Sequence, residues 1–206
     1  QTLLDADWYR RAWDAYNESP SGQHPPEVNT ALAALSPSET GNAPYVFETR
    51  ELLDYFRAAD IAREFSLDIM LIGSGDEYRR LNAIGDIDAW FVLPLAFPEP
   101  PDVSTGETTL RELRHWNAAP ENPARLEAAG IDFALTAFRD ESPADFLDNL
   151  RDAVKRGLSH ETALASLTTV PARWLGIEES AGRLFSGAFA NVIVADNDLF
   201  DDGSSI

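Results

Sequence analysis

Four short runs of apolar residues limit how this chain can fold. The runs lie at 45–47, 69–72, 89–93 and 133–136, and segments with helical periodicity separate them. Strands that are buried on both faces have such unbroken apolar sequences, whereas strands with one face in water alternate apolar and polar residues. Helices between parallel strands supply the crossovers that such strands require. The pattern therefore predicts an α/β fold made of βαβ units.

The sequence around these runs predicts three regions. Residues 1–43 form a helical N-terminal segment or insertion, with helices expected at Thr2–Tyr16 and Glu27–Leu35 around a proline-containing loop. Residues 44–180 hold the apolar runs and include a long insertion, 94–130, that begins with several prolines. Residues 181–206 are expected to form a C-terminal strand, Asn191–Ala195, and an acidic tail.

Helix signals are clearest downstream of the insertion. Short helices are expected around 110–116 and 123–129, and Ser142 and Gly157 are placed to cap the two ends of a longer one. Ser159 is expected to begin a further helix that Thr169–Pro171 interrupts and that ends at Gly176.

The charge balance excludes some classes of partner. The chain has 16 Lys and Arg against 35 Asp and Glu, a formal net charge of −19, which would repel nucleic acid and an anionic membrane surface. No apolar stretch approaches the roughly 18 residues that span a bilayer, and no targeting segment is visible, so the cellular compartment stays open. The first residue is not Met, which favours a portion of a longer chain. With no cysteine, disulfides and thiolate chemistry are excluded.

Charged residues follow the first and fourth apolar runs. Glu48 comes directly after the first run, and Arg139 and Asp140 follow the fourth. Ligands of parallel α/β proteins meet the carboxyl ends of strands, so Glu48 and Asp140 are weak catalytic candidates and Arg139 is a ligand-binding candidate. Exposed loop positions are the alternative interpretation.

A glycine turn follows the second run. Gly73, Ser74 and Gly75 stand between a predicted strand and a predicted helix, where backbone N–H groups can bind an anion. The third glycine of a dinucleotide-binding motif is absent, so a tight turn is the alternative. The histidines, His24, His115 and His160, show no metal-ligand spacing, and we expect them to be exposed or to cap helices.

The C-terminal third resembles a known family. Gly157-Leu-Ser-His-Glu-Thr-Ala-Leu-Ala through Pro171-Ala-Arg-Trp-Leu-Gly176, then Gly182–Gly187 and Ala190-Asn-Val-Ile-Val-Ala-Asp196, is similar to the end of the amidohydrolase superfamily, in particular its imidazolonepropionase-like branch. This resemblance implies a portion of a TIM-like (β/α)8 barrel and a final strand that belongs to a small β-sandwich. It also extends upstream to about Pro44.

The resemblance further implies a metal-dependent hydrolase, but its ligand positions are altered here. The fifth-strand and sixth-strand histidines of the family fall at Glu48 and Gly73, and the eighth-strand aspartate falls at Phe138. The His-x-His pair of the first strand is not present, and Lys155, the single lysine, lies on a predicted helix where it cannot bridge metals. We therefore expect no metal or other cofactor on this chain.

Three functions remain open on the sequence, so whether the chain is an enzyme stays undecided. The first is an amidohydrolase-like pseudoenzyme domain that supports an intact hydrolase half, with the remainder of the chain or a second copy as partner. The second is a hydrolase of C–N bonds, peptide or non-peptide, that uses zinc or another divalent metal with its remaining ligands upstream. The third is a binding domain for small anions at Gly73, Ser74 and Gly75.

Overall fold

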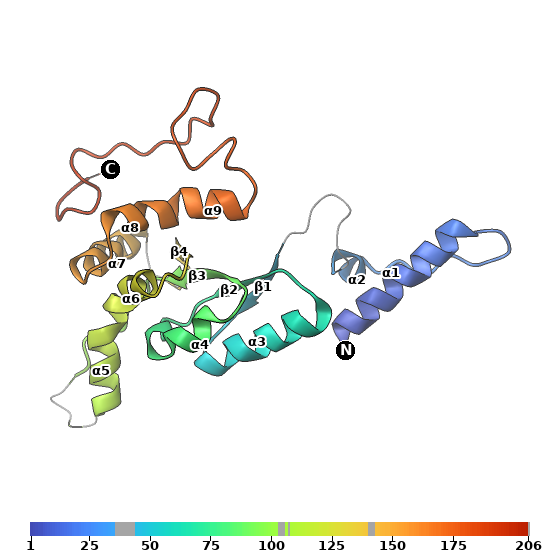
Figure 1. Cartoon of the computed structure of the whole chain (residues 1–206), viewed down its shortest axis with the longest axis horizontal. Helices are drawn as coiled ribbons and strands as arrows, with labels where there is room; N and C mark the ends of the chain where they lie inside the picture. Colours follow the sequence, from blue (N-terminus) through green and yellow to red (C-terminus); the bar gives the residue numbers. More distant parts are fainter. Residues whose placement is uncertain (36–43, 103–105, 107, 140–142, 206) are drawn as a thin grey trace.

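The structure is a computed structural model that describes residues 1–35, 44–102, 106, 108–139 and 143–205. Within this part of the chain, four strands form one parallel sheet in the order β1–β2–β3–β4 (Figure 1). The predicted α/β class is confirmed. Each strand pairs with the next one along the chain, an order that arises when successive βα units lie side by side. The strands are β1 Tyr45–Glu48, β2 Ile69–Ile72, β3 Trp90–Pro94 and β4 Phe133–Thr136.

Helical crossovers join the strands, as parallel pairing requires. α3 (Leu52–Phe65) joins β1 to β2, and a 3₁₀ turn, η1 (Glu77–Arg79), with α4 (Leu81–Gly85) joins β2 to β3. The third crossover and the helices that follow β4 lie further along the chain. They are α5 Leu110–Ala118, η3 Ala119–Glu121, α6 Asn122–Ala128, α7 Pro143–Lys155, α8 His160–Leu167 and α9 Thr169–Trp174.

The apolar runs supply the core. Leu71 of β2, Leu93 of β3 and Phe133 of β4 are almost fully buried and pack with residues of the surrounding helices. β1 differs from the expectation of strands buried on both faces, because Val46 is 57% exposed. Glu48 shares this face with Val46 and is also exposed, so the described residues leave this face of β1 uncovered.

Local capping chemistry sets several of the helix ends. The Ser159 hydroxyl accepts from the backbone N–H of Thr162 at 3.1 Å, and Gly157 has a φ of +111° after α7, a conformation that glycine adopts without strain. Asn29 caps α2 (Thr30–Ala34), which therefore begins three residues later than predicted. The predicted cap Ser142 lies outside the described residues.

The predicted interruption of the helix that follows Ser159 is confirmed, although its position differs from Thr169–Pro171. The backbone leaves the helical region one residue earlier, at Thr168, and Pro171 lies inside the first turn of α9. Helices tolerate proline in their first turn, because the N–H groups there have no partner within the helix.

The predicted C-terminal strand, Asn191–Ala195, is wrong. The structure assigns no strand to these residues, and the apolar side chains of Val192, Ile193 and Val194 are 56%, 71% and 78% exposed. A strand forms only when a neighbouring strand accepts and donates its backbone hydrogen bonds. No strand within the described residues pairs with this segment.

The N-terminal helices lie to one side of the sheet (Figure 1). α1 (Thr2–Glu18) buries Tyr9, whose hydroxyl accepts from the backbone N–H of Asn29 at 3.1 Å and so links α1 to the cap of α2. The hydroxyl of Tyr45 in β1 donates to the carbonyl of Leu35 just after α2. Among the described residues, none of the helices combines the length and apolar character needed to cross a lipid bilayer.

Candidate functional site

Glu48 and Arg139 lie together at the carboxyl ends of the outer strands. Nη2 of Arg139 donates to Oε1 of Glu48 at 3.3 Å and to the carbonyl of Thr49 at 2.9 Å. Three strand spacings would separate β1 from β4 by about 14 Å in a flat sheet. The loop after β4 and the long Arg139 side chain together bridge this separation. The catalytic or binding role of the pair stays a prediction. Asp140, the other predicted residue, lies outside the described residues.

The glycine turn after β2 already holds a carboxylate of the chain itself. The N–H groups of Ser74 and Gly75 donate to Oε1 of Glu77 at 2.8 and 3.1 Å. The Glu77 side chain is fully buried. An external anion at this turn would therefore compete with Glu77, and the predicted anion site remains untested.

Two further side chains complete the environment of Glu77. The Tyr55 hydroxyl donates to Oε1 of Glu77, and it accepts from the Ser74 N–H at 2.7 Å. Nδ2 of Asn122 donates to Oε2 of Glu77. Oδ1 of Asn122 accepts from the backbone N–H of Tyr78 at 2.8 Å. We call Tyr55, Ser74, Gly75, Glu77 and Asn122 the Glu77 network. It has four donors to one buried carboxylate.

Gly73 sits against this network. A Cβ atom built on Gly73 would lie 2.4 Å from Oε1 of Glu77, far inside van der Waals contact, and 3.3 Å from the Tyr55 hydroxyl, which is a tight contact. The space next to Gly73 is therefore occupied. Gly73 is the position to which the family resemblance assigns the sixth-strand histidine.

The described residues at the strand ends do not fit a divalent metal. Glu48 is in contact with Arg139 and Arg50, Gly73 has no side chain, and Phe138 offers only an apolar ring. Divalent metals in amidohydrolase-type sites need several nitrogen or carboxylate ligands that converge. Within the residues that the structure describes, no three His, Asp or Glu side chains converge in this way.

Burial sets the ionisation of Tyr55. Burial first, and then the charge of Glu77 and its hydrogen bond, raise the pKa of Tyr55 well above its ordinary value near 10. In the folded protein Tyr55 therefore keeps a proton that the unfolded chain gives up. Above pH 10 the free energy of unfolding is expected to fall by about 1.4 kcal/mol per pH unit from this residue.

Urea unfolding between pH 9 and 11 measures this slope. Tyr55→Phe should flatten it, whereas Tyr16→Phe on α1, outside the network, should leave it unchanged. Equal slopes in wild type and Tyr55→Phe would contradict the assignment.

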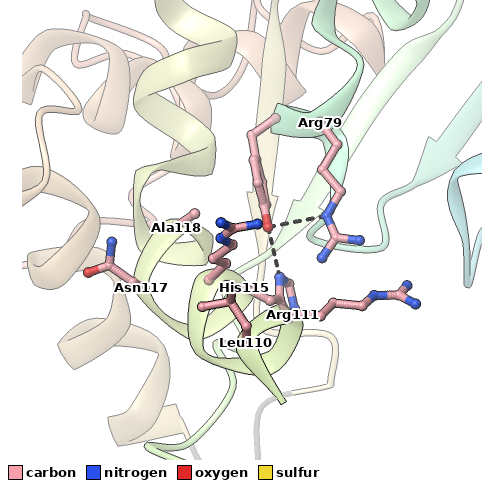
Figure 2. A pocket seen from close by; sticks show the side chains of 8 residues that line it. Arg79, Leu110, Arg111, His115, Asn117 and Ala118 are labelled. Atoms are coloured by element: carbon pink, nitrogen blue, oxygen red, sulfur yellow. Dashed lines mark hydrogen bonds between the residues drawn. The ribbon is translucent and has the colours of Figure 1, made fainter.

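The histidines differ in their surroundings. His24 lies in an exposed loop, and His160 begins α8 with its Nδ1 3.2 Å from the Asp198 carboxylate. These two agree with exposed or capping positions. The His115 side chain is only 30% exposed, and it lines a pocket of about 490 Å³ between η1 and α5 (Figure 2). The pocket residues are Tyr78, Arg79, Leu110, Arg111, Arg114, His115, Asn117 and Ala118.

Known structures resemble this fold, although no family model matches the sequence and no curated protein is found as a relative. An amidohydrolase from Thermotoga maritima superposes with a TM-score of 0.71 at 20% identity, over 98% of this chain and 52% of that one. A second amidohydrolase gives 0.51 at 18% identity, over 76% and 38%. An uncharacterized protein gives 0.55 at 17% identity, over 84% and 42%.

The superposition with the Thermotoga structure covers only about half of that structure. The chain spans about half the length of the Thermotoga structure, and its four consecutive parallel strands lie within that half. The activity of a whole amidohydrolase therefore does not transfer with the fold. The chain has the fold of one portion of known amidohydrolase structures.

Proposed function

We propose that the chain is an amidohydrolase-like domain whose own strand ends carry no metal centre and which supports an intact hydrolase half. The filled space beside Gly73 carries this proposal. A histidine there would have to displace Glu77, which is fully buried and accepts hydrogen bonds from Tyr55, Ser74, Gly75 and Asn122. The network stabilises this end of the sheet with hydrogen bonds where the family would use metal ligands.

The free edges of the sheet are the reason to expect a partner in this proposal. In this proposal the four strands are a portion of a TIM-like (β/α)8 barrel. β1 and β4 each leave one edge without a strand neighbour among the described residues. Exposed edges favour pairing with further strands. The partner would be the remainder of a longer amidohydrolase chain or a second copy of this chain. Nucleic acid and membranes are disfavoured by the charge of −19.

Glu48 favours a second candidate function. Its carboxylate is at the end of β1 and is 43% exposed, so it could ligate a divalent metal if Arg139 moved away. The chain would then contribute to a zinc-dependent hydrolase of C–N bonds whose remaining ligands come from other sequence.

Metal analysis separates the two functions. The chain, and any longer protein that contains it, would be incubated with zinc, dialysed and analysed for metal, with and without Glu48→Gln. We expect far less than one zinc per copy of the isolated chain, and in the longer protein a zinc content and hydrolase activity that Glu48→Gln leaves unchanged. Glu64→Gln, an exposed glutamate on α3, is the matched control. Zinc at one equivalent that only Glu48→Gln removes would establish the second function instead.

A further inference from the structure

The pocket between η1 and α5 has the size of a small-molecule site. Its volume of about 490 Å³ falls in the range of small-ligand pockets, and both walls belong to crossovers between strands. It is separate from the turn at Gly73, because none of its lining residues belongs to that turn or donates to the carboxylate of Glu77.

One face of α5 provides cations to this pocket. Arg111, Arg114, His115 and Ala118 recur at intervals of three and four residues and so share that face of the helix. Most arginines of the chain form ion pairs, as its acidic composition favours. Arg111 and Arg114 form none within the described residues.

The opposite wall holds a fixed aromatic ring. Nε of Arg79 donates to the Tyr78 hydroxyl at 3.2 Å, and that hydroxyl lies 3.1 Å from Nδ1 of His115 (Figure 2). The Tyr78 and His115 rings stack with centroids 6.2 Å apart, and the Arg125 guanidinium lies 5.4 Å from the centroid of the Tyr78 ring. The ring is therefore held by contacts from both crossovers, and Tyr78 lines the pocket.

The acidic groups around the pocket have other partners. Oδ2 of Asp76 pairs with Nη1 of Arg79 at 3.2 Å, and Glu121 pairs with Arg125 at 2.7 Å. Oδ1 of Asp76 lies 3.2 Å from Nδ1 of His115 and has no hydrogen bond within the described residues. Glu112, on α5 itself, accepts from the N–H and the hydroxyl of Thr109 at the start of the helix. None of these carboxylates forms an ion pair with Arg111 or Arg114 within the described residues.

We propose that this pocket binds a small organic carboxylate with an apolar body. The carboxylate pairs with the guanidinium groups of Arg111 and Arg114, which present fork-shaped donors suited to planar anions. The apolar body lies against the Tyr78 ring, with Leu110 and Ala118 at its edge. The site does not depend on the proposed supporting role, because it uses neither strand ends nor a metal.

Titration of the chain with benzoate, benzamide and inorganic phosphate tests the proposal. Benzoate should bind saturably, and benzamide, which has the same ring without the charge, should bind at least about tenfold more weakly, since a charge-assisted bidentate pair is lost. Phosphate has the charge without the apolar body, so it should also bind more weakly than benzoate.

Variants locate the binding. Arg111→Gln combined with Arg114→Gln should weaken benzoate binding at least about tenfold. Arg183→Gln removes an exposed arginine that forms no ion pair in the described residues and lies outside the pocket, so it should leave binding unchanged. Equal melting temperatures would show that the exposed arginines are not needed for folding.

Three results would overturn the proposal: no saturable benzoate binding, benzoate binding that the double variant retains, or phosphate binding as tight as benzoate. The metal analysis above is independent of these titrations, so the two proposals can fail separately.

Discussion

Glu77→Ala is expected to lower the free energy of unfolding by about 3 kcal/mol. Glu77 is fully buried, and its carboxylate accepts from the Tyr55 hydroxyl, two backbone N–H groups and Asn122. Alanine would leave these donors without an acceptor in a space closed to bulk water, and each buried unsatisfied group costs about 1–3 kcal/mol. The removed burial of a charged group offsets part of this loss.

Urea unfolding at neutral pH measures the change in the free energy of unfolding. Two further variants serve as comparisons. Glu77→Gln keeps the shape but turns a donor toward the Asn122 amide, so it should cost about 1–2 kcal/mol. Glu64→Ala, on the exposed surface of α3, should stay within about 0.5 kcal/mol of wild type. A cost below about 1 kcal/mol for Glu77→Ala would show that the network contributes little to stability.

The strands and most helices could be predicted from sequence because their signals are local. Unbroken apolar runs at 69–72 and 133–136 mark β2 and β4, and the chemistry of Ser159 and Gly157 marks helix ends. The segment Asn191–Ala195 has an equally good apolar pattern, yet it forms no strand. An apolar pattern shows only that a segment is suited to a strand. The strand forms when a second strand lies beside it and shares its backbone hydrogen bonds.

The candidate site was harder to predict, because its contacts join distant residues. The charged residues after strands were visible, and the structure brings Glu48 and Arg139 together across 91 positions. Ser74 and Gly75 of the Glu77 network were predicted as site residues, but Tyr55, Glu77 and Asn122 were missed. Glu77 meets Tyr55 across 22 positions and Asn122 across 45, and no spacing rule links residues so far apart. The three-to-four spacing of Arg111, Arg114 and His115 was visible, but their role depends on Tyr78, which only the tertiary structure places opposite them.

Gly73→Ala is expected to lower the free energy of unfolding by about 2–3 kcal/mol, the cost of overpacking a closed site. The added Cβ would lie 2.4 Å from Oε1 of Glu77 and 3.2 Å from Cδ2 of Leu93. Gly85→Ala is the matched control, because its Cβ would meet only Ile131 side-chain atoms at 3.5 Å or more. That control should lie within about 0.5–1 kcal/mol of wild type, on the stabilising side.

A double-mutant cycle then identifies what opposes a side chain at Gly73. If the Glu77 carboxylate is the obstacle, Glu77→Ala vacates the space that the new Cβ needs. The double variant Gly73→Ala, Glu77→Ala should then cost at least about 1 kcal/mol less than the two single costs added together. Additive costs would mean that Leu93, rather than the Glu77 carboxylate, excludes side chains at this strand end. The packing support for an altered metal site would then be lost, even if Gly73→Ala alone is strongly destabilising.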